Sequence, residues 1–477
     1  LFVVLVYAVG DRGSKLLEVN PLKPFEFTNR RHNGEFVQQI KDLMIKGKAA
    51  FGDNPFRMHT EWAEFVVLPS AFTQELRRDP RLVFDEPAVD VSSICIKLKI
   101  LLWGNPEITS IITKYLTKAL VKLTKPISEE ATLVLRLVFT NSTDWHQITP
   151  RKDITRIISR LSSRVFMGEE LCRNEEWVRV SGDYSASAFP VARSVGQWPQ
   201  WARPIVHWFL PSCWSVRCLL AECRRTLKPH LERRNGRKAT ALARGETEPL
   251  FDDSIEWYEK QCTTEYDTAS EQITSSLVAI HITSYLLQQT MLDLASHPEL
   301  FQPLREELVR VLSAEGLEKT AFHNLKLMDS VIKESQRRNP SLLSTWRRLV
   351  KDIGLSTGFV LRKGQKIIST NIHMWDPQYY ENSLEYDGYR FLKMRSTDEE
   401  KLASLAYNPQ LMPYGMALLP DPSAVLLIRR RKEEIDLYSL EYRESKRYGM
   451  RERRQPQFHW KDAMLCSIEH QRHIALY

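Results

Sequence analysis

The chain has 477 residues, of which 43% are hydrophobic, 10% aromatic and 26% charged. This balance excludes an intrinsically disordered chain, which is poorer in apolar residues, and a protein with many membrane spans, which is richer in them. The formal net charge is +8, and the segment 429–477 alone supplies +4 of it, from 12 Lys/Arg and 8 Asp/Glu. Because the rest of the chain is only mildly basic, we expect no nucleic-acid partner.

Several catalytic motifs are absent from the sequence. No Gly-x-Gly, Gly-Lys-Ser/Thr, His-Glu-x-x-His or Gly-x-Ser-x-Gly occurs, which excludes the common phosphate loops, the helical zinc proteases and the hydrolases with a nucleophile elbow. The seven cysteines form no Cys-x-x-Cys pair, so reduced and mostly buried thiols are favoured over a zinc site.

The N-terminal segment 1–9 is wholly apolar and ends at Gly10. It is shorter than the roughly 20 residues that a membrane-spanning helix needs. Segment 1–10 is therefore either the remnant of a longer anchor helix, or a short strand or buried run. A signal peptide is disfavoured because no basic residues precede the apolar run.

Further along the chain, the pattern favours helices over most of the length. Residues 196–214 are crowded with Trp and Pro and predict a packed or membrane-facing irregular loop. Residues 273–294 are apolar on nearly every face, which predicts a central buried helix, and 325–338 is again helical. Alternation in 348–370 around Gly358 and Gly364 indicates a small antiparallel strand unit. The sequence thus predicts a mainly α fold with a small β region.

Five short motifs follow one another in a characteristic order. The segments 162–174 (SSRVFMGEELCRN) and 251–257 (FDDSIEW) come first, and His-Pro-Glu at 297–299 follows. A Glu-x-x-Arg pair at 334–337 precedes Tyr-Asp-Gly-Tyr-Arg-Phe at 386–391 by about fifty residues. Together, from about residue 20 to 391, they resemble the cytochrome P-450 superfamily of haem-thiolate monooxygenases, and most of all its branch in filamentous-fungal secondary metabolism.

The resemblance implies a cytochrome P-450-like fold over residues 20–415, with haem between the central helix and a cysteine loop. Glu334, Arg337 and Arg390 match the buried ionic cluster of that family, which would lock its helix to the segment beneath the haem. Arg347 or Arg348 falls where the family often places an arginine near a haem propionate. The alternative for this last pair is two surface arginines at the start of a strand.

Two departures from the family stand at its reaction centre. Ile282 occupies the position of the family's oxygen-binding threonine, and the side chain of isoleucine cannot form a hydrogen bond. Thr283 is the next residue. It either takes over the role of that threonine from a shifted position, or is a core hydroxyl bonded to its own helix backbone. The cysteine loop, Phe-x-x-Gly-x-x-x-Cys-x-Gly, is missing, and no cysteine lies between Cys262 and Cys466. Cys466 lacks the glycine two residues on and is an unfavourable iron ligand, so no metal ligand is assigned.

The sequence pattern is lost abruptly after Gly415, so the fold is expected to be incomplete at its C-terminus. Residues 416–477 form an aberrant basic tail without an amphipathic face, and we expect them to pack poorly. A reading-frame slip, a splice error or true divergence would each produce such a loss.

By resemblance, the expected function is haem-dependent oxidation of a small lipophilic secondary metabolite, such as a terpenoid. Electrons would come from NADPH through a cytochrome reductase, on the cytosolic face of the endoplasmic reticulum membrane, with the anchor truncated or absent here. The missing cysteine leaves a second possibility, a catalytically inactive chain without thiolate-ligated haem. A third possibility is a binding protein that uses its basic tail.

Overall fold

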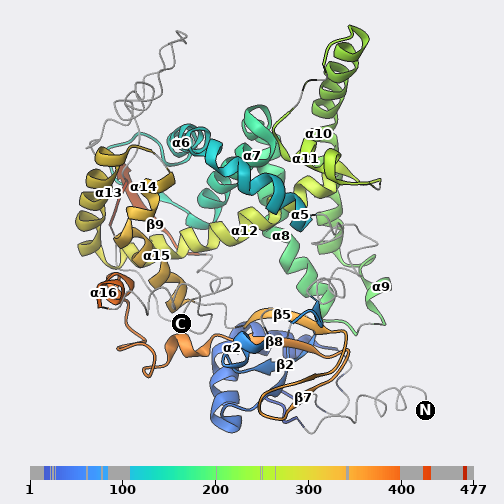
Figure 1. The fold of residues 1–477 in the computed structure, drawn as a ribbon, viewed down its shortest axis with the longest axis vertical. Coiled ribbons are helices and arrows are strands. Elements are labelled where there is room, and N and C mark those ends of the chain that lie inside the picture. The colour runs from blue at the N-terminus through green and yellow to red at the C-terminus, as the bar shows by residue number, and fades with distance from the viewer. Residues whose placement is uncertain are drawn as a thin grey trace.

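The computed structural model describes residues 16–83 and 108–397, with gaps at 22, 24–25, 27, 61–62, 77–78, 200, 248, 250, 264, 318 and 340–342, together with 423–430 and 466–469. Helices dominate this part of the chain, and the five-stranded sheet forms a smaller region beside α2 (Arg30–Phe51) (Figure 1). The expected mainly α fold with a small β region is confirmed. Segment 1–10, expected to be an anchor remnant, lies outside the described residues.

The helical layer is built from α6 (Thr117–Phe139), α7 (Pro150–Cys172), α8 (Glu175–Gly196), α10 (Pro211–Ala243) and α12 (Thr268–Ala295). Helix α12 crosses the middle of this layer and packs against α7 and α8 (Figure 1). Its residues Ile273, Leu277 and Ile280 are at most 1% exposed, because the sequence places apolar side chains at helical spacing on that side.

Helix starts are set by local capping. Asn174 accepts a hydrogen bond from the Trp177 N–H at the start of α8, and Asp253 accepts one from the Glu256 N–H at the start of α11 (Ser254–Gln261). These side chains satisfy backbone donors that the first helical turn leaves without partners.

Shorter helices complete the described chain. They are α3 (Phe72–Leu76), α5 (Ile108–Ile111), the π-helix η1 (Ile112–Leu116), α9 (Arg203–Val206), η2 (Pro298–Leu300), α13 (Phe301–Glu315), α14 (Lys319–Asn324), α15 (Lys326–Arg338), η3 (Ile372–Trp375) and α16 (Arg390–Thr397). The predicted irregular loop at 196–214 is partly helical, since it contains α9 and the first turn of α10.

The main sheet has five strands in the order β1-β2-β8-β5-β3. They are β1 (Phe56–His59), β2 (Glu64–Leu68), β8 (Lys366–Thr370), β5 (Leu343–Leu349) and β3 (Leu82–Val83). Only the β2–β8 pair of this sheet is parallel. The strand unit predicted at 348–370 is present, as the end of β5, the hairpin β6 (Ile353–Gly354) with β7 (Val360–Leu361), and β8. Gly358 and Gly364 adopt φ of +82° and +88°, which suits glycine at these turns.

The expectation that the chain packs poorly beyond Gly415 is wrong for one segment. Strand β9 (Leu426–Arg430) lies between β4 (His146–Ile148) and β10 (Cys466–Glu469), and Leu426 and Ile428 are 2% and 0% exposed. The two-residue spacing of these side chains turns both to the core, although the surrounding sequence is charged. Residues 416–422, 431–465 and 470–477 of the expected tail lie outside the described residues.

Candidate functional site: an ionic cluster beside the central helix

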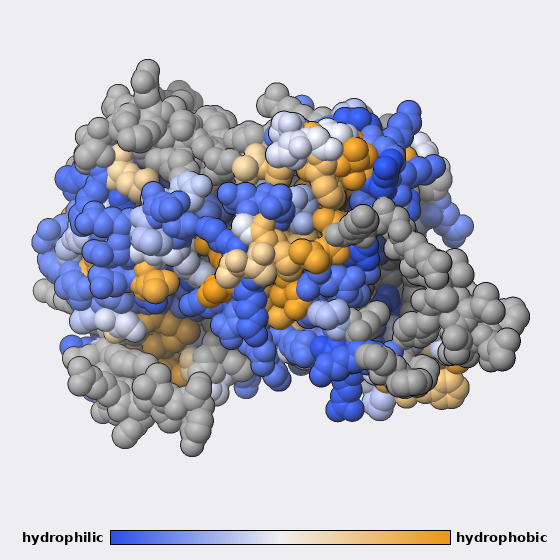
Figure 2. Space-filling model, turned by 90° about the horizontal axis from the view of Figure 1, so that it is seen from below, coloured by the Kyte–Doolittle hydropathy of each residue, from blue (hydrophilic) through white to orange (hydrophobic). Residues whose placement is uncertain are grey.

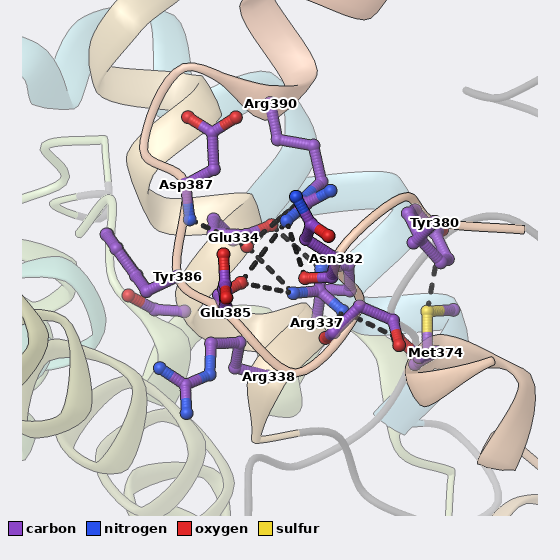
Figure 3. Close-up of polar contacts among 12 residues, drawn as sticks. Glu334, Arg337, Arg338, Met374, Tyr380, Asn382, Glu385, Tyr386, Asp387 and Arg390 are labelled. Carbon is purple, nitrogen blue, oxygen red and sulfur yellow. Dashed lines mark hydrogen bonds and ion pairs between the residues drawn. The ribbon is translucent and has the colours of Figure 1, made fainter. Parts of the chain in front are cut away.

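The three residues expected to form an ionic cluster lie together (Figure 3). Arg337 donates from Nε and Nη2 to the two carboxylate oxygens of Glu334, both at 2.8 Å, and Arg390 Nε donates to the same oxygens at 3.1 Å. Glu334 and Arg337 are 0% exposed and Arg390 is 8% exposed. One buried carboxylate therefore holds two guanidinium groups from segments more than fifty residues apart.

The remaining donors of the cluster bind the chain between η3 and α16. Arg337 Nη1 donates to the carbonyl oxygens of Met374 and Ser383 at 2.7 and 2.6 Å, and Arg390 Nη1 donates to that of Glu381 at 2.5 Å. The cluster thus helps to fix this irregular segment against α15.

The central helix carries an open face next to its packed side. Ile282 is 43% exposed, Leu287 is 37% exposed, and Thr283 between them is also exposed. Burial of α12 on nearly every side, as the sequence suggests, is therefore wrong at Leu287. An apolar strip at the centre of a helical layer fits a flat apolar group lying against it, because such a group would remove the strip from water.

Arg347 and Arg348 are half-buried neighbours in β5. Arg347 pairs with Ile367 and Arg348 with Lys366 in the β5–β8 register. Successive residues of a strand point to opposite faces of its sheet, so only one of the two arginines can serve a propionate on a given face.

The described cysteines do not fit an iron thiolate. Burial raises the pKa of Cys172 and of Cys223 to about 12, and it also raises the pKa of Cys213, so these three remain protonated thiols. Cys262 is half-buried directly after α11, and Cys218 is exposed on α10. None of the described thiols is therefore suited to be the axial ligand of a haem.

Cys466 lies in β10 and pairs with Arg430 of β9 across the strand ladder. Nothing in the backbone of this strand creates the loop that the family's ligand cysteine occupies. Its placement gives no support for a role as iron ligand.

Sequence reasoning missed His281 on α12. This imidazole is 6% exposed and stacks on Phe189 of α8, with ring centroids 4.1 Å apart and an interplanar angle of 30°. Burial lowers its pKa to about 4, so it is neutral at pH 7. The sequence signal that could have pointed to it is a histidine between the apolar residues Ile280 and Ile282 of a predicted buried helix.

Comparison with known proteins identifies the family. The family model for cytochrome P-450 matches residues 107–416. The chain is 44% identical to the cytochrome P-450 monooxygenase eqxH of Fusarium heterosporum, over 92% of this chain and 95% of that protein. It is 32% identical to the cytochrome P-450 monooxygenase adrA of Penicillium rubens, over 91% of this chain and 95% of that protein.

A solved structure supports the fold. The retinoic acid-bound cyanobacterial CYP120A1 superimposes with a TM-score of 0.57 at 17% identity, covering 82% of this chain and 84% of that one. At this identity the likeness concerns the fold alone. Family match, fungal relatives and fold agree: the chain belongs to the cytochrome P-450 family of haem monooxygenases, in its fungal secondary-metabolism branch.

Proposed function

We propose that the chain oxidises a lipophilic secondary metabolite, such as a terpenoid, held against the open face of α12. The exposed side chains of Ile282 and Leu287 carry this proposal, because a metabolite of low polarity gains free energy by covering them. Haem, when bound, supplies the activation of dioxygen that such an oxidation requires. Arg347 or Arg348 would pair with a haem propionate, and Thr283 is the nearest hydroxyl to Ile282 in the sequence.

The test of this proposal is the spectrum of the full chain, expressed with added haem precursor and then reduced under carbon monoxide. A thiolate-type band together with a stoichiometric amount of haem would support monooxygenase chemistry. Purified chain that holds no haem under these conditions would overturn it.

A second candidate function rests on a separate observation. No described cysteine suits an iron ligand, and no cysteine at all lies between Cys262 and Cys466. We propose as this alternative that the chain keeps the family's fold but not its oxygen chemistry. Haem that binds but gives no thiolate-type band with carbon monoxide is its expected result, and sequencing of the gene beyond the Gly415 codon would distinguish a frame slip from true divergence.

For the electron donor, we propose an NADPH-dependent cytochrome reductase that docks on a lysine row along η1 and α6. The row consists of Lys114, Lys118, Lys122 and Lys125, all exposed. Spacings of four, four and three residues place these ammonium groups along one side of the helix, where they attract an acidic partner.

Charge reversal tests this docking surface. Lys118→Glu with Lys122→Glu should weaken reductase binding at low salt by at least about tenfold and reduce its salt dependence. The control is Lys228→Glu, since Lys228 is 74% exposed on α10, in a different helix. Equal binding by both variants would exclude the lysine row.

For the cellular location, we propose the cytosolic face of the endoplasmic reticulum membrane. No described helix has the length and apolar character to span a bilayer. A mostly aromatic surface around α9 could contact the bilayer. It comprises Trp198, Trp201, Ile205, Trp208, Phe209 and Trp214, which are 37% to 80% exposed.

Tryptophan is enriched where proteins meet the lipid headgroups, which makes this surface suited to a bilayer. Two arginines hold the segment in place: Arg203 Nε donates to the Trp198 carbonyl at 2.8 Å, and Arg217 lies 4.6 Å from the centre of the Trp208 ring. Apolar area is also exposed amid hydrophilic surface on the side drawn in Figure 2.

Flotation with phosphatidylcholine vesicles tests the membrane contact. Trp201→Ser with Phe209→Ser should release most of the protein from the vesicles, whereas Phe322→Ser, at a 48% exposed phenylalanine of α14, should not. Retention of the double variant at the wild-type level would rule out this surface.

A further inference from the structure

Arg217 on α10 carries a positive charge that no described carboxylate pairs with. Its Nη2 donates to the carbonyl oxygen of His207 at 3.1 Å and lies 2.7 Å from the imidazole Nδ1 of the same residue. The other two nitrogens of the guanidinium, Nε and Nη1, are buried and hydrogen-bond no residue. Within the described part of the chain, one charged group is thus largely shielded from water and only partly satisfied.

Such a group calls for an explanation, because a buried donor without an acceptor costs free energy and a buried charge without a counter-charge costs more. An oxyanion is the acceptor that suits it best. Hydrogen bonds from a guanidinium to a phosphate are charge-assisted, and they are about twice as strong as hydrogen bonds between neutral groups. The unused N–H groups of Arg217 therefore favour an anion as their partner.

The position of Arg217 indicates which kind of anion this is. Its guanidinium carbon lies 4.6 Å from the centre of the Trp208 ring, which is 61% exposed and belongs to the aromatic surface around α9. Trp214 of the same surface is 65% exposed and precedes Arg217 by three residues on α10, so the two share a side of that helix. Helix α9 lies at the periphery of the molecule (Figure 1). The arginine thus stands directly behind the side chains that we propose to contact the bilayer.

The sequence around Arg217 adds to the same charge preference. Residues 184–221 contain no Asp or Glu, whereas Arg193, Arg203 and Arg217 fall within them. This stretch therefore holds no carboxylate that would repel a negatively charged surface. A basic residue held close to an anionic bilayer strengthens binding by roughly fivefold.

We propose that Arg217 binds the headgroup phosphate of an anionic phospholipid when the aromatic surface rests on a membrane. The inference rests on the membrane contact proposed above and names the class of lipid that this contact prefers. The tryptophans supply affinity for any bilayer, because their rings suit the headgroup region. Arg217 supplies the preference for a headgroup of net negative charge.

Trp208 controls access to this site. Its ring stacks on the guanidinium, and its large exposed area allows it to turn towards the lipid. Exposed side chains change rotamer within picoseconds to nanoseconds, so this movement does not limit binding. Insertion of the ring into the headgroup region and exposure of the N–H groups to a phosphate are then one event.

Flotation of the purified full chain tests the proposal with two kinds of vesicle, pure phosphatidylcholine and phosphatidylcholine with about one fifth replaced by phosphatidylserine. The readout is the ratio of the two affinities, which cancels any loss of aromatic contact that affects both vesicles alike. Wild-type protein should prefer the anionic vesicles, and Arg217→Gln should reduce that preference about fivefold. Arg217→Lys keeps the charge without the guanidinium geometry and should retain part of the preference.

The matched control is Arg237→Gln, which removes the same charge from an exposed site on the same helix. It lies about 30 Å further along the helix axis, well beyond the roughly 8–10 Å over which salt screens charges. Its preference should stay within about twofold of that of the wild type. Thermal unfolding of each variant confirms that folded proteins are compared.

The outcomes separate this inference from the membrane contact on which it rests. Equal loss of preference in Arg217→Gln and Arg237→Gln would overturn the proposal, because diffuse attraction by a basic chain would then explain the preference. Wild-type protein that binds both vesicles equally well would exclude the role of Arg217 and leave the membrane contact intact. Wild-type protein that binds neither vesicle would count against the membrane contact itself, and with it the lipid site.

Discussion

Replacing Glu334 with alanine should destabilise the protein far more than the loss of an ordinary helical ion pair. Glu334 and Arg337 are three residues apart on α15, and on a solvent-exposed helix such a pair contributes about 0.2–0.5 kcal/mol. In this structure Glu334 is 0% exposed and accepts four hydrogen bonds from two arginines. Removing it strands two buried guanidinium groups, for which a loss of about 3–5 kcal/mol is expected.

The assay is urea unfolding of the full chain, followed by tryptophan fluorescence. Glu334→Gln should fall between alanine and wild type, because the amide oxygen still accepts a hydrogen bond but carries no charge. The control is Arg362→Ala, which breaks the exposed pair of Arg362 with Asp352 and should cost no more than about 1 kcal/mol. A Glu334→Ala variant within about 1 kcal/mol of that control would refute the buried-cluster reasoning.

Two further predictions concern α12 and the turn before α16. The pKa of His281 is about 4 in the folded chain and about 6.5 in an unfolded one, so between these values the unfolded state binds a proton that the folded state does not. The free energy of unfolding of the wild type should therefore fall by up to about 3 kcal/mol as pH drops through this window. The fall should be smaller in His281→Phe, whereas the exposed control His323→Phe should show the same fall as wild type. Parallel pH profiles for all three proteins would contradict this prediction. An alanine Cβ at Gly388 would lie 2.7 Å from Leu300, so Gly388→Ala should cost about 1–3 kcal/mol by urea unfolding, whereas Gly236→Ala, in open space on α10, should stabilise by up to about 1 kcal/mol.

The ionic cluster and the central helix were predictable because the sequence patterns that indicate them are either local residue spacings or the order of motifs along the chain. Glu334 and Arg337 stand at helical spacing, and Arg390 follows in a motif that the resemblance assigns to the same cluster. The apolar run of α12 likewise predicts its central place. It could not predict the open face at Leu287, because an unbroken apolar pattern does not show which side meets another helix.

Contacts between distant segments were beyond the sequence. Strand β9 pairs with β4, which lies about 280 residues earlier, and nothing in the charged sequence around it indicates such a partner. The His281 ring stacks on Phe189, which lies on another helix about ninety residues earlier in the sequence. The opposite orientations of Arg347 and Arg348 follow from the two-residue period of a strand once both residues are placed in β5, which begins before the strand unit that the sequence predicts.

The structure separates what maintains this fold from what would perform its chemistry. Ile273, Leu277 and Ile280 bury the packed side of α12, and full burial of each such side chain contributes about 1.5–3 kcal/mol. The ionic cluster fixes the segment before α16 through backbone carbonyls and needs no cofactor to do so. Because neither set of contacts involves the open face or a thiolate, a chain of this family can lose its ligand cysteine and still keep its helical framework. The fold of the family therefore depends on the helical core and the ionic cluster, whereas its oxygen chemistry depends on one thiolate that these contacts do not involve.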